Sequence, residues 1–230
     1  MEKTNKPRYH RMKLILLFIA PVIFLSVVAI PNKNKKPVNL TASSINDKGN
    51  KKTDYKVNDI NSDKIAAGKK REEESKAAFN EAYRVFMHPR CLNCHPAGDT
   101  PFQGDAGLLH TQGVKRGPDG KGLYAMKCKN CHQDTNIPGE HMPPGHPNWH
   151  LPPAHRKMVF EGKSPRQLAM SFKDPKFTGF KTMAQFIEHV EKDPLVMHSF
   201  TYGTRPPLSH EEFAAKVKEW VEKGAVLPDK

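Results

Sequence analysis

The sequence has few apolar residues, only four cysteines, and no pattern typical of β-strands. Apolar residues make up 37% of the 230 positions and charged residues 27%, so a large hydrophobic core is not expected. The net charge of +13 is unevenly placed, since residues 1–76 hold 17 lysines and arginines against 8 aspartates and glutamates. Most of the excess therefore lies near the N-terminus. Because no DNA- or RNA-binding module pattern is present either, we expect no nucleic-acid partner.

Long apolar runs are missing except near the N-terminus. A basic segment, residues 3–13, precedes an uncharged apolar run of 17 residues, Leu14–Ile30. Residues 1–30 are therefore predicted to be a signal sequence or an N-terminal membrane anchor, with membrane contact through residues 14–30. No cysteine follows the run, which excludes a lipoprotein anchor. Both interpretations export the rest of the chain. We expect a periplasmic protein, either soluble or tethered to the inner membrane.

The remaining chain is predicted to comprise a polar flexible tether, residues 31–75, and a folded domain, residues 76–230. Phe79, Ala82, Tyr83 and Phe86 have helical spacing. Three later helices are predicted from capping-box patterns, which begin at these residues: Ser164, Thr182 and Ser209. The segment 89–155 is rich in proline and glycine and lacks periodicity. So long a loop fits a compact domain only if something other than side chains fills its core.

All four cysteines lie in two pentapeptides of the same form, Cys-Leu-Asn-Cys-His and Cys-Lys-Asn-Cys-His. Cys-x-x-Cys-His is the attachment pattern for c-type haem. Two thiols form thioethers with the porphyrin vinyl groups, and the histidine that follows binds the iron. Two covalently bound haem c groups are therefore predicted, with thioethers at Cys91, Cys94, Cys128 and Cys131. The predicted proximal iron ligands are His95 and His132.

Other uses of the four cysteines explain less. A zinc site formed from two Cys-x-x-Cys pairs would leave the adjacent histidines and the export signal unexplained. Structural disulfides suit an exported chain but do not account for the repeated histidine. A thioredoxin-like redox pair requires a βαβ context, and the sequence shows none. The predicted fold class is mainly α and cytochrome-c-like. It has short helices, long Pro/Gly-rich loops around two covalent haems, and little or no sheet.

The distal iron ligands are less well defined by the sequence. His110 lies 15 residues beyond His95 and is the candidate for the first haem, with His88 as its rival. The choice matters, because a methionine thioether raises the reduction potential relative to a second imidazole. For the second haem the sequence leaves two main candidates open, Met142 and His150, and does not exclude His141 or His146.

Five segments together resemble a family of small exported cytochromes c, described as isoquinoline oxidoreductase cytochrome subunits. They are MHPRCLNCHPAGD, RGPDGKG, CHQDTNIPG, PPGHPNWHLPP and MVFEGKSP, and the likeness runs from about residue 77 to 225. The resemblance implies two haem sites at the two Cys-x-x-Cys-His patterns. It also implies a role in receiving electrons from a molybdenum hydroxylase and passing them to a downstream acceptor. Residues 1–75 lie outside the likeness.

The function predicted from the sequence is electron transfer between redox partner proteins, by an exported cytochrome with two haems. Only 33 residues separate Cys94 from Cys128, which favours haems that lie close together in one domain. Two alternatives are a dihaem enzyme such as a peroxidase and a zinc-binding adaptor. A peroxidase needs an open iron position, so carbon monoxide binding to the reduced protein separates the first alternative. A pyridine haemochrome spectrum separates the second, because a zinc protein gives none.

Overall fold

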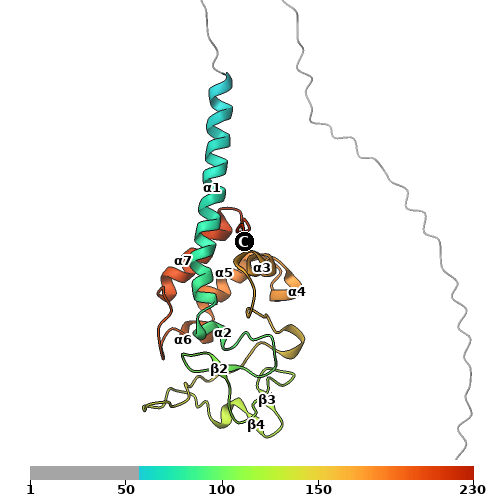
Figure 1. Ribbon diagram of the computed structural model, residues 1–230, viewed down its shortest axis with the longest axis vertical. Helices are drawn as coiled ribbons and strands as arrows, with labels where there is room; N and C mark the ends of the chain where they lie inside the picture. Colours follow the sequence, from blue (N-terminus) through green and yellow to red (C-terminus); the bar gives the residue numbers. More distant parts are fainter. Residues whose placement is uncertain (1–56) are drawn as a thin grey trace, which may run out of the picture. The chain divides into compact units, whose positions relative to one another are not determined.

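The computed structural model describes residues 57–230, in which helices account for most of the regular structure (Figure 1). The helices are α1 (Val57–Phe86), α2 (Pro89–Leu92), α3 (Pro165–Phe172), α4 (Pro175–Thr178), α5 (Met183–Lys192), α6 (Pro194–His198) and α7 (His210–Glu222). Two 3-10 turns are η1 (Cys128–Asn130) and η2 (Ala154–Arg156). The strands are β1 (Phe102–Gln103), β2 (Leu108–Leu109), β3 (Gly122–Leu123) and β4 (Met126–Lys127). The prediction of a mainly α protein with little sheet is confirmed at this level.

Two predictions concern residues beyond this range. The signal sequence or anchor, residues 1–30, and the part of the tether before residue 57 lie outside the described residues. Within residues 57–230, no helix is both long enough and apolar enough to cross a membrane.

Helix α1 is longer than the sequence pattern predicts. It begins at Val57, so residues 57–75 are helical and the prediction of a flexible tether is wrong for them. The expected start of the helix was set by an apolar stripe. Side chains 62–73 face solvent and form no such stripe, so the sequence pattern did not reveal this part of the helix. Lysine, glutamate and alanine favour helices by intrinsic propensity. Ion pairs one turn apart add support, such as Lys70–Glu74 at 3.9 Å.

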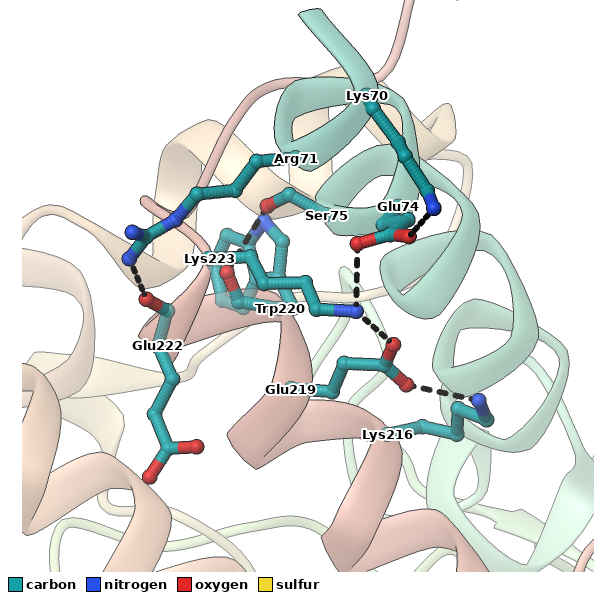
Figure 2. Close-up of polar contacts among 9 residues, drawn as sticks. All are labelled: Lys70, Arg71, Glu74, Ser75, Lys216, Glu219, Trp220, Glu222 and Lys223. Carbon is teal, nitrogen blue, oxygen red and sulfur yellow. Dashed lines mark hydrogen bonds and ion pairs between the residues drawn. The ribbon is translucent and has the colours of Figure 1, made fainter. Parts of the chain in front are cut away.

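The C-terminal half of α1 lies against α7, and polar contacts join the two helices (Figure 2). The buried hydroxyl of Ser75 donates to the carbonyl of Trp220 at 2.9 Å. The Lys223 ammonium lies between two carboxylates, 3.0 Å from Glu74 and 2.6 Å from Glu219. These contacts join the last residues before position 76 to the folded domain.

The predicted stripe on α1 and the predicted helix starts are confirmed. Phe79, Ala82 and Phe86 are buried, and Tyr83 donates its hydroxyl to the Lys163 carbonyl at 2.7 Å. Capping boxes with both reciprocal hydrogen bonds begin α3 at Ser164 and α7 at Ser209. Thr182 caps α5 by accepting from Gln185 N, whereas the Gln185 side chain accepts from Lys181 N rather than Thr182 N.

Aromatic rings form the hydrophobic core, which the four longest helices and one loop build together. Pairs in contact include Phe79–Trp220 and Phe86–Phe172, both with ring centres 4.7 Å apart. The buried rings are Phe79, Phe86, Phe160, Phe172, Phe186, Phe213 and Trp220. Phe160 is the member from the loop, and it connects this core to the region that holds the cysteines.

Between α2 and α3 the chain is mostly loop, interrupted by two short antiparallel hairpins, β1–β2 and β3–β4. Glycine allows the backbone to pack closely in this region. Gly120 has φ +80°, and a Cβ there would fall on the carbonyl of Leu151. The Leu151 amide in turn donates to the Gly120 carbonyl at 2.9 Å. The segment that precedes Cys128 is thereby attached to the segment that follows His150.

Candidate functional site

The two Cys-x-x-Cys-His patterns fold into similar helical turns. In the first pattern, which ends α2, the Cys94 amide donates to the Cys91 carbonyl at 3.1 Å. In the second, which contains η1, the Cys131 amide donates to the Cys128 carbonyl at 3.2 Å. Residues three apart on a helical turn lie on the same side. Each turn therefore holds two thiols side by side with a histidine directly after them. All four thiols are free.

His95 is held in one orientation by a loop far along the chain. Its Nδ1 lies 2.8 Å from the carbonyl oxygen of Met158. Its ring stacks on Phe160 with centres 3.8 Å apart and planes 3° apart. A carbonyl can only accept, so Nδ1 carries the proton, and Nε2 of the neutral ring keeps its lone pair. Burial lowers the pKa of His95 to about 4, which keeps the imidazole neutral at physiological pH.

His132 is held in the same way by different residues. Its Nδ1 donates to the carbonyl oxygen of Pro144 at 2.7 Å, and its ring stacks on Trp149 with centres 4.2 Å apart and planes 9° apart. Burial also lowers the pKa of His132. Both histidines therefore offer Nε2 as a metal ligand, with the second nitrogen fixed by a backbone carbonyl. This is the second contact that orients metal-bound imidazoles in proteins.

Sequence reasoning missed most of these supporting residues. No local pattern gave a role to Met158, Phe160 or Pro144. A stacked aromatic after each pattern would have been the signal. Phe160 follows its histidine at a distance of 65 residues, however, and the local sequence does not indicate such a contact.

The thiols differ from those of redox-active cysteine pairs. Burial raises the pKa of Cys91 to about 12 and that of Cys94 to about 11. Burial raises the pKa of Cys128 as well. Reactive pairs in thioredoxin-like proteins have a lowered thiol pKa instead. The pKa shifts of these three thiols are opposite in direction.

The two patterns lie near each other in the folded domain. Beyond burial, the proximity of Cys128 contributes to the raised pKa of Cys94. Tyr202 lies between the two patterns. Its ring centre is 6.0 Å from that of Trp149, and the guanidinium of Arg90, the residue before Cys91, lies 4.8 Å from the centre of the Tyr202 ring. The sequence analysis assigned no role to Tyr202 or Arg90.

Among the candidate distal ligands in the described residues, one has its ring beside the ring of a proximal histidine. The ring centre of His110 lies 6.4 Å from that of His132. The spacing along the chain had associated His110 with the first pattern, but its ring adjoins the second. His88 caps α2 by accepting from Arg90 N at 3.2 Å, so its Nδ1 is already used.

The two main candidates for the second site are placed differently. Met142 is 43% exposed, and its side chain lies over Gly139 in its own turn. His150 donates from Nδ1 to the Asn148 carbonyl at 2.5 Å and lines a surface pocket together with Leu195 of α6.

Apolar side chains are exposed around the second pattern. Six of the nine large apolar residues that are exposed in the described part of the chain fall within residues 108–142. They are Leu108, Leu109, Tyr124, Met126, Ile137 and Met142. This part of the chain therefore leaves more large apolar side chains exposed than the helical part does.

The described part of the chain has no cluster of side chains that could bind a metal ion by themselves. No three histidine, cysteine, aspartate or glutamate side chains there are grouped to hold one. An iron already held by four porphyrin nitrogens needs only one or two protein ligands. Comparison with protein-family models, with curated proteins and with solved structures finds no match for this chain.

Proposed function

We propose that residues 76–230 form an exported dihaem c-type cytochrome that transfers electrons between redox proteins. The observation that carries the proposal is the shared geometry of His95 and His132. Each follows two adjacent thiols, donates from Nδ1 to a carbonyl, stacks on an aromatic ring and keeps Nε2 as a ligand. Covalent haem supplies reversible one-electron chemistry at its iron.

The chain supplies the attachment, orientation and cover for two such groups. Cys91 and Cys94 hold the first haem, and Cys128 and Cys131 hold the second. Phe160 and Trp149 keep the two proximal imidazoles from rotating. A macrocycle beside the second pattern would cover apolar side chains that the polypeptide leaves exposed, including Leu109 and Met126. This cover explains how a long loop region low in regular structure belongs to an ordered domain.

The proximity of the two patterns supports electron exchange within the domain. A series of contacts joins the two turns. The ring of Trp149 lies beside that of Tyr202, and the guanidinium of Arg90 lies over the Tyr202 ring. Burial raises the pKa of Tyr202, and the neighbouring Cys94 raises it further, so the phenol stays protonated. The two bound haems would supply the one-electron chemistry, and these contacts would keep the two attachment turns close together.

The second pattern is the better site for partner docking. Cys131 is exposed although Cys128 is buried, whereas Cys91 and Cys94 are both partly buried. An exposed attachment edge lets a partner approach closely through a small, transient interface. By the family resemblance, the donor is a molybdenum hydroxylase and the acceptor a downstream carrier.

The test is expression of the full chain in a host that matures c-type cytochromes. Mass spectrometry of the denatured protein is expected to show two added haem masses, and the pyridine haemochrome spectrum to show two haems per chain. The double substitutions Cys91→Ala/Cys94→Ala and Cys128→Ala/Cys131→Ala are each expected to remove one haem. A colourless chain of bare polypeptide mass from that host would refute the proposal. Fast carbon monoxide binding at both reduced irons would favour a peroxidase-type enzyme.

A further inference from the structure

His110 and His132 have the separation expected of two imidazoles on opposite sides of one metal. Their ring centres are 6.4 Å apart, with planes inclined at 58°. A metal–nitrogen bond of about 2.0 Å, plus about 1.1 Å from that nitrogen to the ring centre, puts two such centres about 6 Å apart. The two rings can rotate independently about the axis through the metal, so the 58° inclination is compatible with this arrangement.

The protonation of both rings agrees with that arrangement. His110 donates from Nδ1 to the carbonyl of Thr111 at 2.9 Å, as His132 does to Pro144. With Nδ1 as the donor to a carbonyl, Nε2 is the nitrogen of each ring that can bind a metal. The same kind of contact orients His132, which the Cys-x-x-Cys-His pattern marks as a ligand.

The backbone around His110 is fixed, so the ring is held in place rather than free on a loop. The His110 amide donates to the Pro101 carbonyl at 2.9 Å, directly after the β1–β2 hairpin. The hairpin is joined to the first pattern through Asn93, whose carbonyl accepts from Phe102 N at 3.0 Å. Leu108 and Leu109, just before His110, are each 64% exposed and provide apolar surface beside the ring.

We propose that His110 is the distal iron ligand of the second haem, opposite His132. The inference rests on the proposed function, since it requires haem at Cys128 and Cys131. The hairpin that follows the first attachment pattern thus closes the second haem site. The second iron has two imidazole ligands and no open position, which suits electron transfer and excludes substrate binding at that iron.

Two substitutions test the proposal in the haem-loaded full chain. His110→Ala removes the ligand, so one of the two ferric haems becomes high-spin by electron paramagnetic resonance, and the reduced protein binds one equivalent of carbon monoxide. His110→Met replaces imidazole by thioether. One haem then gains the far-red sulfur-to-iron charge-transfer band, and its reduction potential rises. His150→Ala and Met142→Leu are the matched controls, and both leave the two haems as in the wild type.

The outcomes separate this inference from the proposed function. A chain without haem refutes the proposed function and the inference with it. A chain with two haems whose spin states, carbon monoxide binding and potentials are unchanged by both His110 substitutions refutes the inference alone. The same holds if His150→Ala or Met142→Leu opens the site instead. Haem content and far-ultraviolet circular dichroism, measured on every variant, show whether the fold is retained.

Discussion

At the scale of single residues, an aromatic ring stacks on each proximal histidine and limits how that histidine can rotate. Phe160 has two roles, because it packs in the hydrophobic core and also stacks on His95. It contacts Phe86 and Phe172 with ring centres 5.6 and 5.4 Å away, and it stacks on His95 at 3.8 Å. A smaller apolar side chain that still fills much of the core site but has no flat face can separate these roles.

Phe160→Leu is expected to lower the free energy of unfolding by about 1–2 kcal/mol, since it removes part of a buried side chain from the core. The same change frees the His95 ring to rotate, so the paramagnetic resonance signal of one haem shifts while the other is unchanged. Phe177→Leu, which alters a partly buried ring packed on Phe172, is the control and leaves both signals in place. An unshifted spectrum in Phe160→Leu would show that stacking does not orient His95.

Proline after aspartate is the signal for the short helices that the sequence analysis did not predict. Asp174 caps α4 and Asp193 caps α6, and in each case proline occupies the first turn. The carboxylate of Asp193 accepts from the amides of Leu195 and Val196 at 2.9 and 3.1 Å. The predicted helix starts relied on capping boxes, which require a glutamate or glutamine three residues later, and neither aspartate has one.

The Asp193 cap gives a pH-dependent contribution to stability. A hydrogen bond with His189, together with amide donors in α6, lowers the pKa of Asp193 to about 2. A carboxyl whose pKa is lower in the folded state stabilises the fold above its unfolded pKa of about 4, and this contribution is lost as the pH falls toward 2. Asp193→Asn keeps the cap but not the charge. Relative to wild type, it should be less stable at pH 6, and the difference should shrink by pH 2.5.

Denaturant unfolding at the two pH values measures this difference. Asp193→Ala serves as the comparison, because it removes the cap as well and is expected to cost about 1 kcal/mol more at pH 6. A difference between Asp193→Asn and wild type that stays constant with pH would contradict the role of the charge.

At the scale of the whole molecule, the described domain has a helical region with its own hydrophobic core and a loop region without one. Buried rings on α1, α3, α5 and α7 give the helical part its own core. The loop region between α2 and α3 instead exposes apolar side chains, most of them within residues 108–142. The helices should therefore depend less on haem than the loops do.

Removal of all four thiols tests this division. A chain carrying Cys→Ala at positions 91, 94, 128 and 131 is expected to keep most of its helical circular dichroism. Hydrogen exchange should become fast in residues 101–150, while the buried segments of α1 and α7 stay protected. Equal loss of protection in the helices and the loops would show that the helical core does not stand alone.

The sequence by itself determined the local features of this protein. The apolar stripe of Phe79, Ala82 and Phe86 predicted the buried face of α1, and the capping boxes at Ser164 and Ser209 predicted where α3 and α7 begin. The two Cys-x-x-Cys-His patterns located the two helical turns that carry the thiols. All of these signals lie within a few residues of each other, so local stereochemistry is enough to produce them.

Tertiary structure alone decided which distant groups meet. Met158 reaches His95 across 63 residues, and Ser75 reaches Trp220 across 145. The ring of His110 contacts that of His132, although chain spacing pointed to the first pattern. Spacing along a chain limits how far a residue can reach, but the packing of the β1–β2 hairpin determines its direction. The neighbour of His132 therefore depends on contacts that no local sequence pattern contains.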